Sequence, residues 1–112
     1  MPFINTKTNL PISKQAQIAL KASFGEAIGL IGKSEPWLMV QFEPDRNLWM
    51  AGSDAPAAMV EVDLYGAAAP ADYEALTARI TAELEKHLAL PAERIYVRYL
   101  ETAHWGWRGG NF

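Results

Sequence analysis

Apolar and polar positions alternate with a period of two in several segments of the chain, which predicts β-strands. Residues 2–8 place a β-branched side chain at every second position from Ile4, and residues 58–65 carry apolar side chains at Ala58, Val60, Val62 and Leu64. Residues 95–100 alternate in the same way, and residues 38–42 form a short apolar run. Residues 48–51 indicate a brief additional strand.

Two other segments repeat their apolar residues every three or four positions, which predicts amphipathic helices. Ser13 is the expected N-cap of the first helix, which Gly32 ends, and Asp72 is the expected N-cap of the second, which stops before Pro91. The apolar stripe of the first helix is Ala16, Leu20, Phe24, Ile28 and Ile31, and that of the second is Tyr73, Leu76, Ile80, Leu84 and Leu88.

The predicted order is a β-α-β unit followed by a second one, with pseudo-repeats at about residues 2–43 and 57–101 of a single domain, 1–112. Two such units predict an α+β fold with a four-stranded mixed sheet and both helices on one face. The other face then needs a cover, and a chain of 112 residues offers no third helix. We therefore expect another copy of the chain to cover it.

Composition and charge narrow the possible functions. Ten basic against thirteen acidic residues give a net charge of −3, which argues against a nucleic-acid partner or an anionic membrane surface. Cysteine is absent, so disulfides, thiolate metal sites and thiol chemistry are excluded. No apolar run approaches the ~20 residues of a membrane span, and we expect no signal peptide.

The usual catalytic motifs are missing from the sequence. His87 and His104 are far apart and have no ligand spacing, so we expect no metal site. The glycines match neither a phosphate-binding loop nor a dinucleotide fingerprint, and no cofactor is expected. Glu61 and Asp63 share one strand face, where we expect solvated charges rather than a catalytic carboxylate pair.

The start of the chain carries the remaining chemistry. Pro2 follows Met1, and a small second residue normally allows the initiator methionine to be removed. A free secondary amine would then begin the first strand. Apolar surroundings and nearby positive charge lower the pKa of such an amine, and a neutral amine at pH 7 is a usable general base.

The chain resembles the macrophage migration inhibitory factor family of the tautomerase superfamily over essentially its whole length. The resemblance rests on Pro2 at the start of a strand, on Gly32-Lys33, on residues 91–99 and on the tail that contains Trp105-Gly106-Trp107 and Asn111-Phe112. It implies a homotrimer in which three four-stranded sheets form a barrel with the helices outside. It also implies active sites between subunits.

The resemblance implies the following site residues. Pro2, Lys33 and Tyr96 would be catalytic, with Pro2 as the base. Tyr96 and Arg98 would reach in from the neighbouring subunit, and Tyr65 would contribute from the same subunit. The substrate-binding residues would be Phe3, Trp37, Tyr65, Arg98, Trp105, Trp107 and Phe112. The chain departs from vertebrate members at Arg98, where they carry asparagine, and at residues 57–60, which lack their Cys-x-x-Cys.

These features predict a cofactor-independent keto–enol tautomerase of aromatic 2-keto acids such as phenylpyruvate. Lys33 and Arg98 would bind the carboxylate and the developing enolate, and aromatic side chains would hold the ring. Two alternatives remain. One is a superfamily diacid tautomerase, dehalogenase or decarboxylase, suggested by Arg98. The other is a non-enzymatic trimeric signalling or host-interaction protein. The expected location is the cytoplasm, or outside the cell without a signal peptide.

Overall fold

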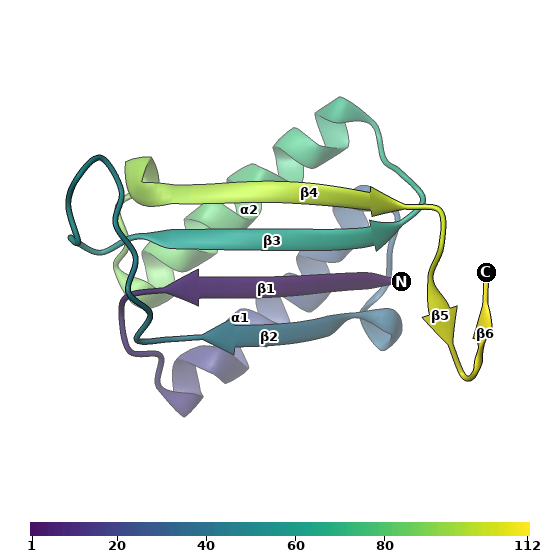
Figure 1. Cartoon of the computed structure of the whole chain (residues 1–112), viewed down its shortest axis with the longest axis horizontal. Coiled ribbons are helices and arrows are strands. Elements are labelled where there is room, and N and C mark those ends of the chain that lie inside the picture. The colour runs from purple at the N-terminus through teal and green to yellow at the C-terminus, as the bar shows by residue number, and fades with distance from the viewer.

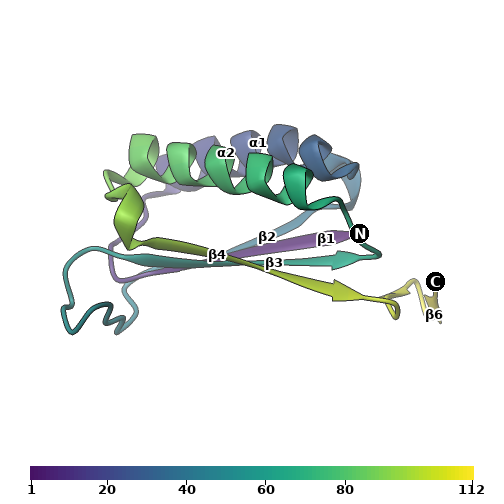
Figure 2. The same ribbon diagram turned by 90° about the horizontal axis from the view of Figure 1, so that it is seen from above.

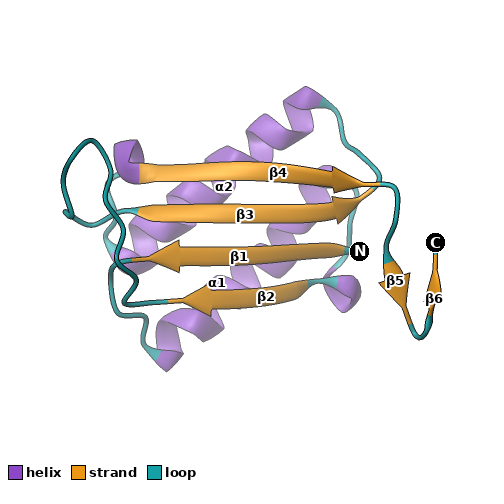
Figure 3. Ribbon diagram, viewed as in Figure 1, coloured by secondary structure: helices purple, strands orange, loops and turns teal.

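The computed structural model describes all 112 residues and has two β-α-β halves. The first half contains β1 (Pro2–Thr8), α1 (Lys14–Ala27) and β2 (Met39–Glu43). The second contains β3 (Ala58–Tyr65), α2 (Pro70–Leu88) and β4 (Ile95–Thr102). A small hairpin of β5 (Gly106–Trp107) and β6 (Gly110–Asn111) ends the chain (Figure 3).

The four long strands form one mixed sheet in the order β2-β1-β3-β4 (Figure 1). β1 is parallel to β2 and antiparallel to β3, and β3 is parallel to β4. Both helices pack on the same face of the sheet (Figure 2). The predicted α+β architecture is therefore confirmed, and β2 and β4 each leave one strand edge unpaired.

The core lies between the helices and the sheet, and the alternation of β3 shows why. Ala58, Val60, Val62 and Leu64 are buried against the helices, while the intervening residues point to the opposite face. That opposite face, which we call the open face, is covered by no element of the chain. On it Met39 is 67%, Tyr96 60% and Leu100 45% exposed.

The helix ends follow local chemistry. Ser13 caps α1 as predicted, because its hydroxyl oxygen accepts a hydrogen bond from the Ala16 amide at 3.1 Å. Gly32 ends this segment in the left-handed conformation (φ 73°), after a short 3-10 helix at Ile28–Ile31. Asp72 is not the N-cap of α2: Ala69 occupies that position without a capping side chain, and Pro70, whose φ suits the first helical position, begins the helix.

The prediction of an additional strand at residues 48–51 is wrong. Only an isolated bridge between Met50 and Ser53 forms there, around a turn in which Ala51 and Gly52 have positive φ. No helix of the structure combines the length and apolar character needed to span a bilayer.

Candidate active site

The start of β1 is hydrogen-bonded to the end of β3, next to Lys33. Pro2 is buried and lies opposite Leu64 in the sheet. The Tyr65 amide donates a hydrogen bond to the Met1 carbonyl at 3.1 Å, and the Lys33 ammonium donates one to the Tyr65 carbonyl at 2.8 Å. The turn at Gly32 places Lys33 between the first helical segment and β2, and the hydrogen bond to Tyr65 holds Lys33 at this end of the sheet.

The N-terminal amine, which Met1 carries in this structure, has a lowered pKa, as a general base requires. Burial lowers the pKa of the Met1 amine, and the positive charge of Lys33 lowers it further. A lowered pKa increases the neutral fraction at neutral pH, and only the neutral amine has a lone pair that can accept a proton. An amine at this end of the sheet is therefore suited to act as a general base.

Aromatic side chains from three parts of the chain form a wall beside this amine. The ring centroids of Tyr65 and Phe112 are 5.5 Å apart, and those of Phe112 and Trp107 are 6.3 Å apart. Trp107 meets Trp37 edge-to-face at 5.0 Å. The terminal hairpin provides this wall by folding back at a turn where Arg108 and Gly109 have positive φ.

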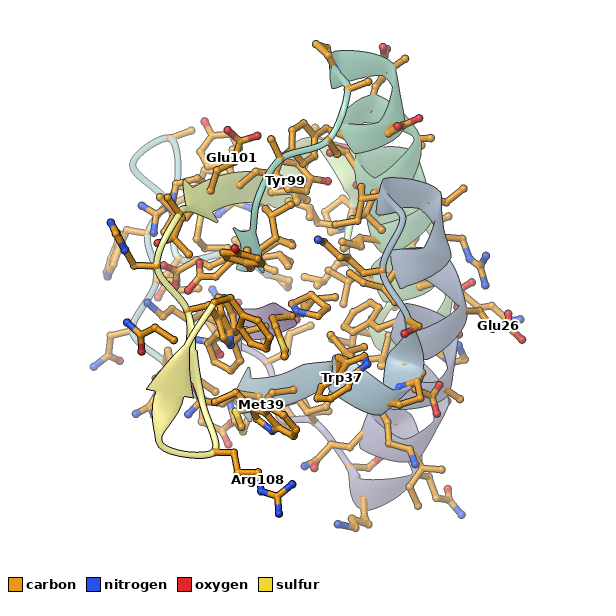
Figure 4. All side chains as sticks on the ribbon, turned by 90° about the vertical axis from the view of Figure 1, so that its right-hand side faces the viewer. Glu26, Trp37, Met39, Tyr99, Glu101 and Arg108 are labelled. Carbon is orange, nitrogen blue, oxygen red and sulfur yellow. The ribbon has the colours of Figure 1, made fainter.

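A cavity of about 390 Å³ lies between this wall and the start of β1. Figure 4 views the same end of the sheet, with Trp37 and Met39 on the β2 side and the hairpin in front. The cavity is within the size range of small-molecule sites. Its lining residues are Met1, Pro2, Phe3, Trp37, Met39, Asp63, Trp105, Gly106 and Trp107.

The structure therefore brings most of the predicted site residues to one end of the sheet, where β1 starts and β3 ends. Five of them line the cavity: Pro2, Phe3, Trp37, Trp105 and Trp107. Lys33, Tyr65 and Phe112 join the same cluster through the contacts described above. A larger cavity of about 590 Å³, between the start of α1 and the end of α2, contains none of the predicted residues.

Two predicted site residues, Tyr96 and Arg98, lie away from the cavity within a single chain. Tyr96 is opposite Met59 and Arg98 opposite Glu61, whereas Pro2 is opposite Leu64. At about 3.3 Å per strand residue, the five positions from Met59 to Leu64 put Tyr96 roughly 16 Å along the sheet from Pro2. Within one chain, Tyr96 and Arg98 do not enter the cavity, and their entry from a neighbour stays a prediction.

The expectation that Glu61 and Asp63 are simply solvated is wrong. Glu61, whose side chain is 18% exposed, forms ion pairs with Arg98 and, at 2.6 Å, with Lys7. The Oδ1 atom of Asp63 is buried and accepts no hydrogen bond. Asp63 and Met39 were not among the predicted site residues, although strand alternation puts both on the same face as Phe3.

Comparisons with known proteins agree with this arrangement. The family model of Macrophage migration inhibitory factor (MIF) matches residues 1–112. A MIF homolog of Trichuris trichiura is 24% identical, with 100% of both chains covered.

Solved structures give the same result. The crystal structure of Leishmania major MIF2 is 39% identical, covers 100% of this chain and 97% of its own, and superposes with a TM-score of 0.95. A Prochlorococcus marinus MIF homologue is 26% identical, with 98% of each chain covered and a TM-score of 0.90. The chain belongs to the macrophage migration inhibitory factor family of the tautomerase superfamily.

Proposed function

We propose that the protein is a cofactor-independent keto–enol tautomerase of aromatic 2-keto acids such as phenylpyruvate, with Pro2 as its general base. The observation that carries this proposal is the N-terminal amine next to Lys33 at the edge of an aromatic cavity. Removal of Met1 would make Pro2 the bearer of that amine. The ring of Pro2 and its place in β1 would then hold the nitrogen rigidly.

The proposed reaction moves one proton. The neutral amine of Pro2 takes a proton from C3 of the keto acid, which leaves an enolate and a charged amine, and the proton then passes to the enolate oxygen. Lys33 favours this course in two ways, because its positive charge stabilises the developing enolate and keeps the amine pKa low. The aromatic wall holds the ring of the substrate through stacking and burial.

A homotrimer with sites between subunits would complete this arrangement. Tyr96 and Arg98 are exposed on the open face, and neither lines the cavity within one chain. The apolar side chains of the open face also require a cover. In the assembly, Tyr96 of a neighbouring copy would donate a hydrogen bond to a substrate oxygen.

A substrate with one carboxylate is favoured over a diacid. Arg98 was the reason to consider a second carboxylate, but its charge is balanced by Glu61. Asp63, in the cavity wall, would also repel a second carboxylate. Faster turnover of an unsaturated dicarboxylate than of phenylpyruvate would contradict this preference.

The proposal is tested by intact mass and by Pro2→Gly. We expect a mass that lacks Met1, and we expect Pro2→Gly to lose phenylpyruvate tautomerisation by about 100-fold or more, the usual contribution of a positioned general base. Pro11→Gly, at an exposed proline, is the matched control and should keep full turnover. Normal turnover by Pro2→Gly, in a protein whose fold is intact by circular dichroism, would overturn the proposed mechanism.

A further inference from the structure

We propose that the aromatic cavity binds an organic ammonium group, with Asp63 as its counter-ion. Two independent features of the wall support this: a carboxylate that lacks a partner in the chain, and aromatic side chains around it. The inference deepens the proposed function, because it names a group that the ring end of a substrate would carry.

Asp63 has no hydrogen-bond or ion-pair partner within the chain. On β3 it is opposite Phe3 on one side and Leu100 on the other. Its buried Oδ1 atom has no donor, and no ion pair in the structure includes it. Glu61, two residues earlier on the same face, shows the contrast, since Lys7 and Arg98 satisfy it. A buried, unpaired carboxylate oxygen is costly, so a ligand that neutralises Asp63 gains affinity.

The aromatic walls favour a cation over other hydrogen-bond donors. Trp37, Trp105, Trp107 and Phe3 line the same cavity as Asp63, and the faces of aromatic rings attract positive charge. Trp37 and Trp107 meet at 83°, so they present rings in two orientations. An ammonium group satisfies both the carboxylate and the rings, whereas a neutral alcohol satisfies only the carboxylate. A carboxylate at the ring end of a ligand would satisfy neither.

The experiment is a binding titration, measured by isothermal titration calorimetry, with two probes that share one ring. The probes are benzylammonium and benzyl alcohol at pH 7, where an aliphatic amine is charged. We expect the wild-type protein to bind benzylammonium about tenfold more tightly than benzyl alcohol. The titration needs no turnover, so a loss of catalysis and a loss of this binding are distinguished.

Variants then assign the effect to the cavity. Asp63→Asn keeps the shape of the side chain and should abolish the preference for benzylammonium over benzyl alcohol. Asp72→Asn, at an exposed aspartate in the first turn of α2, should keep it. Trp107→Leu should weaken benzylammonium binding several-fold and leave Asp63 in place.

Either of two results would overturn the inference. One is equal affinity of the wild-type protein for benzylammonium and benzyl alcohol. The other is an unchanged preference in Asp63→Asn. The first comparison uses only the wild-type protein, and Trp107→Leu changes a different element, so a failure of Asp63→Asn to fold leaves the inference testable.

Discussion

At the scale of single residues, Lys33 connects the helix layer to the chemistry of the amine. Its ammonium group is fixed by a hydrogen bond to the Tyr65 carbonyl, and the amide of the same residue makes the backbone contact that holds Met1. From this position the charge of Lys33 lowers the pKa of the N-terminal amine. The lysine therefore affects both the substrate and the base.

Lys33→Met removes this charge with little change in side-chain length. The amine pKa should rise, because one of the two causes of its lowering is lost. The neutral base is the active form, so the acidic limb of the kcat/KM profile should move to higher pH. A pH–rate series with phenylpyruvate measures the shift, with Lys86→Met, near the C-terminus of α2, as the control. An acidic limb that stays at the same pH would show that Lys33 does not set the pKa of the base.

The resemblance to the family predicted the aromatic wall but not the role of Asp63. Trp37, Trp105 and Trp107 were expected in the wall because they match apolar wall positions of the family. Asp63 was visible only as one charge on a strand face. Its place in a cavity depends on the terminal segment, whose Trp105, Gly106 and Trp107 line the same cavity, and no local pattern in the sequence predicted the hairpin there.

At the scale of elements, the two helices are joined by a polar network around Glu83 of α2. The Glu83 carboxylate accepts a hydrogen bond from Ser23 of α1 at 2.8 Å and from Arg79 at 3.1 Å. His87 lies 3.2 Å away, and Arg79 also contacts Glu26 of α1. The hydrogen bond from Ser23, followed by the contact with Arg79, holds the pKa of Glu83 below its ordinary value.

Glu83→Gln should therefore destabilise the protein in a pH-dependent way. Because the folded-state pKa is lowered, the contribution of Glu83 is fully present above its unfolded pKa and is lost as the pH falls through the folded value. We expect the free energy of unfolding to fall by about 1 kcal/mol at pH 7, with the difference from wild type disappearing in acid. Urea unfolding at several pH values measures this. Glu74→Gln, at an exposed position of α2, should have no such effect.

Elements with one buried face were predictable, and segments fixed by distant contacts were not. The alternation of β3 gave its boundaries correctly, since every second side chain enters the core. The loop before β3 takes its shape from Arg94, whose guanidinium donates to the carbonyls of Met50, Ser53, Ala55 and Pro56. Residues 48–51 have the composition of a strand, but these contacts from Arg94, the residue just before β4, favour a turn instead.

At the scale of the whole molecule, one chain holds two incomplete halves of the proposed site. The amine and the aromatic wall lie at one end of the sheet, and Tyr96 lies towards the other end. The proposed trimer brings the two halves together between copies. Native mass spectrometry should then give three times the 12.4 kDa of the chain.

Mixing two inactive variants tests whether sites are shared. Pro2→Gly lacks the base and Tyr96→Phe lacks the donor, so each alone should have low turnover. When the two are unfolded together and refolded at equal amounts, roughly a quarter of the sites should recover both residues, because each site draws them from two subunits. Recovery of that fraction supports inter-subunit sites. Turnover no higher than the average of the separate variants would contradict them.

Both chain ends lie at the same end of the sheet (Figure 1), where Met1 and Trp107 line the cavity. An affinity tag fused ahead of Met1 would convert the amine into an amide, and one fused after Phe112 would crowd the hairpin. Protein prepared with an uncleaved tag at either end could therefore be well folded and still inactive. The 44–57 loop, at the opposite end of the sheet, is the better position for a dye or an immobilisation handle.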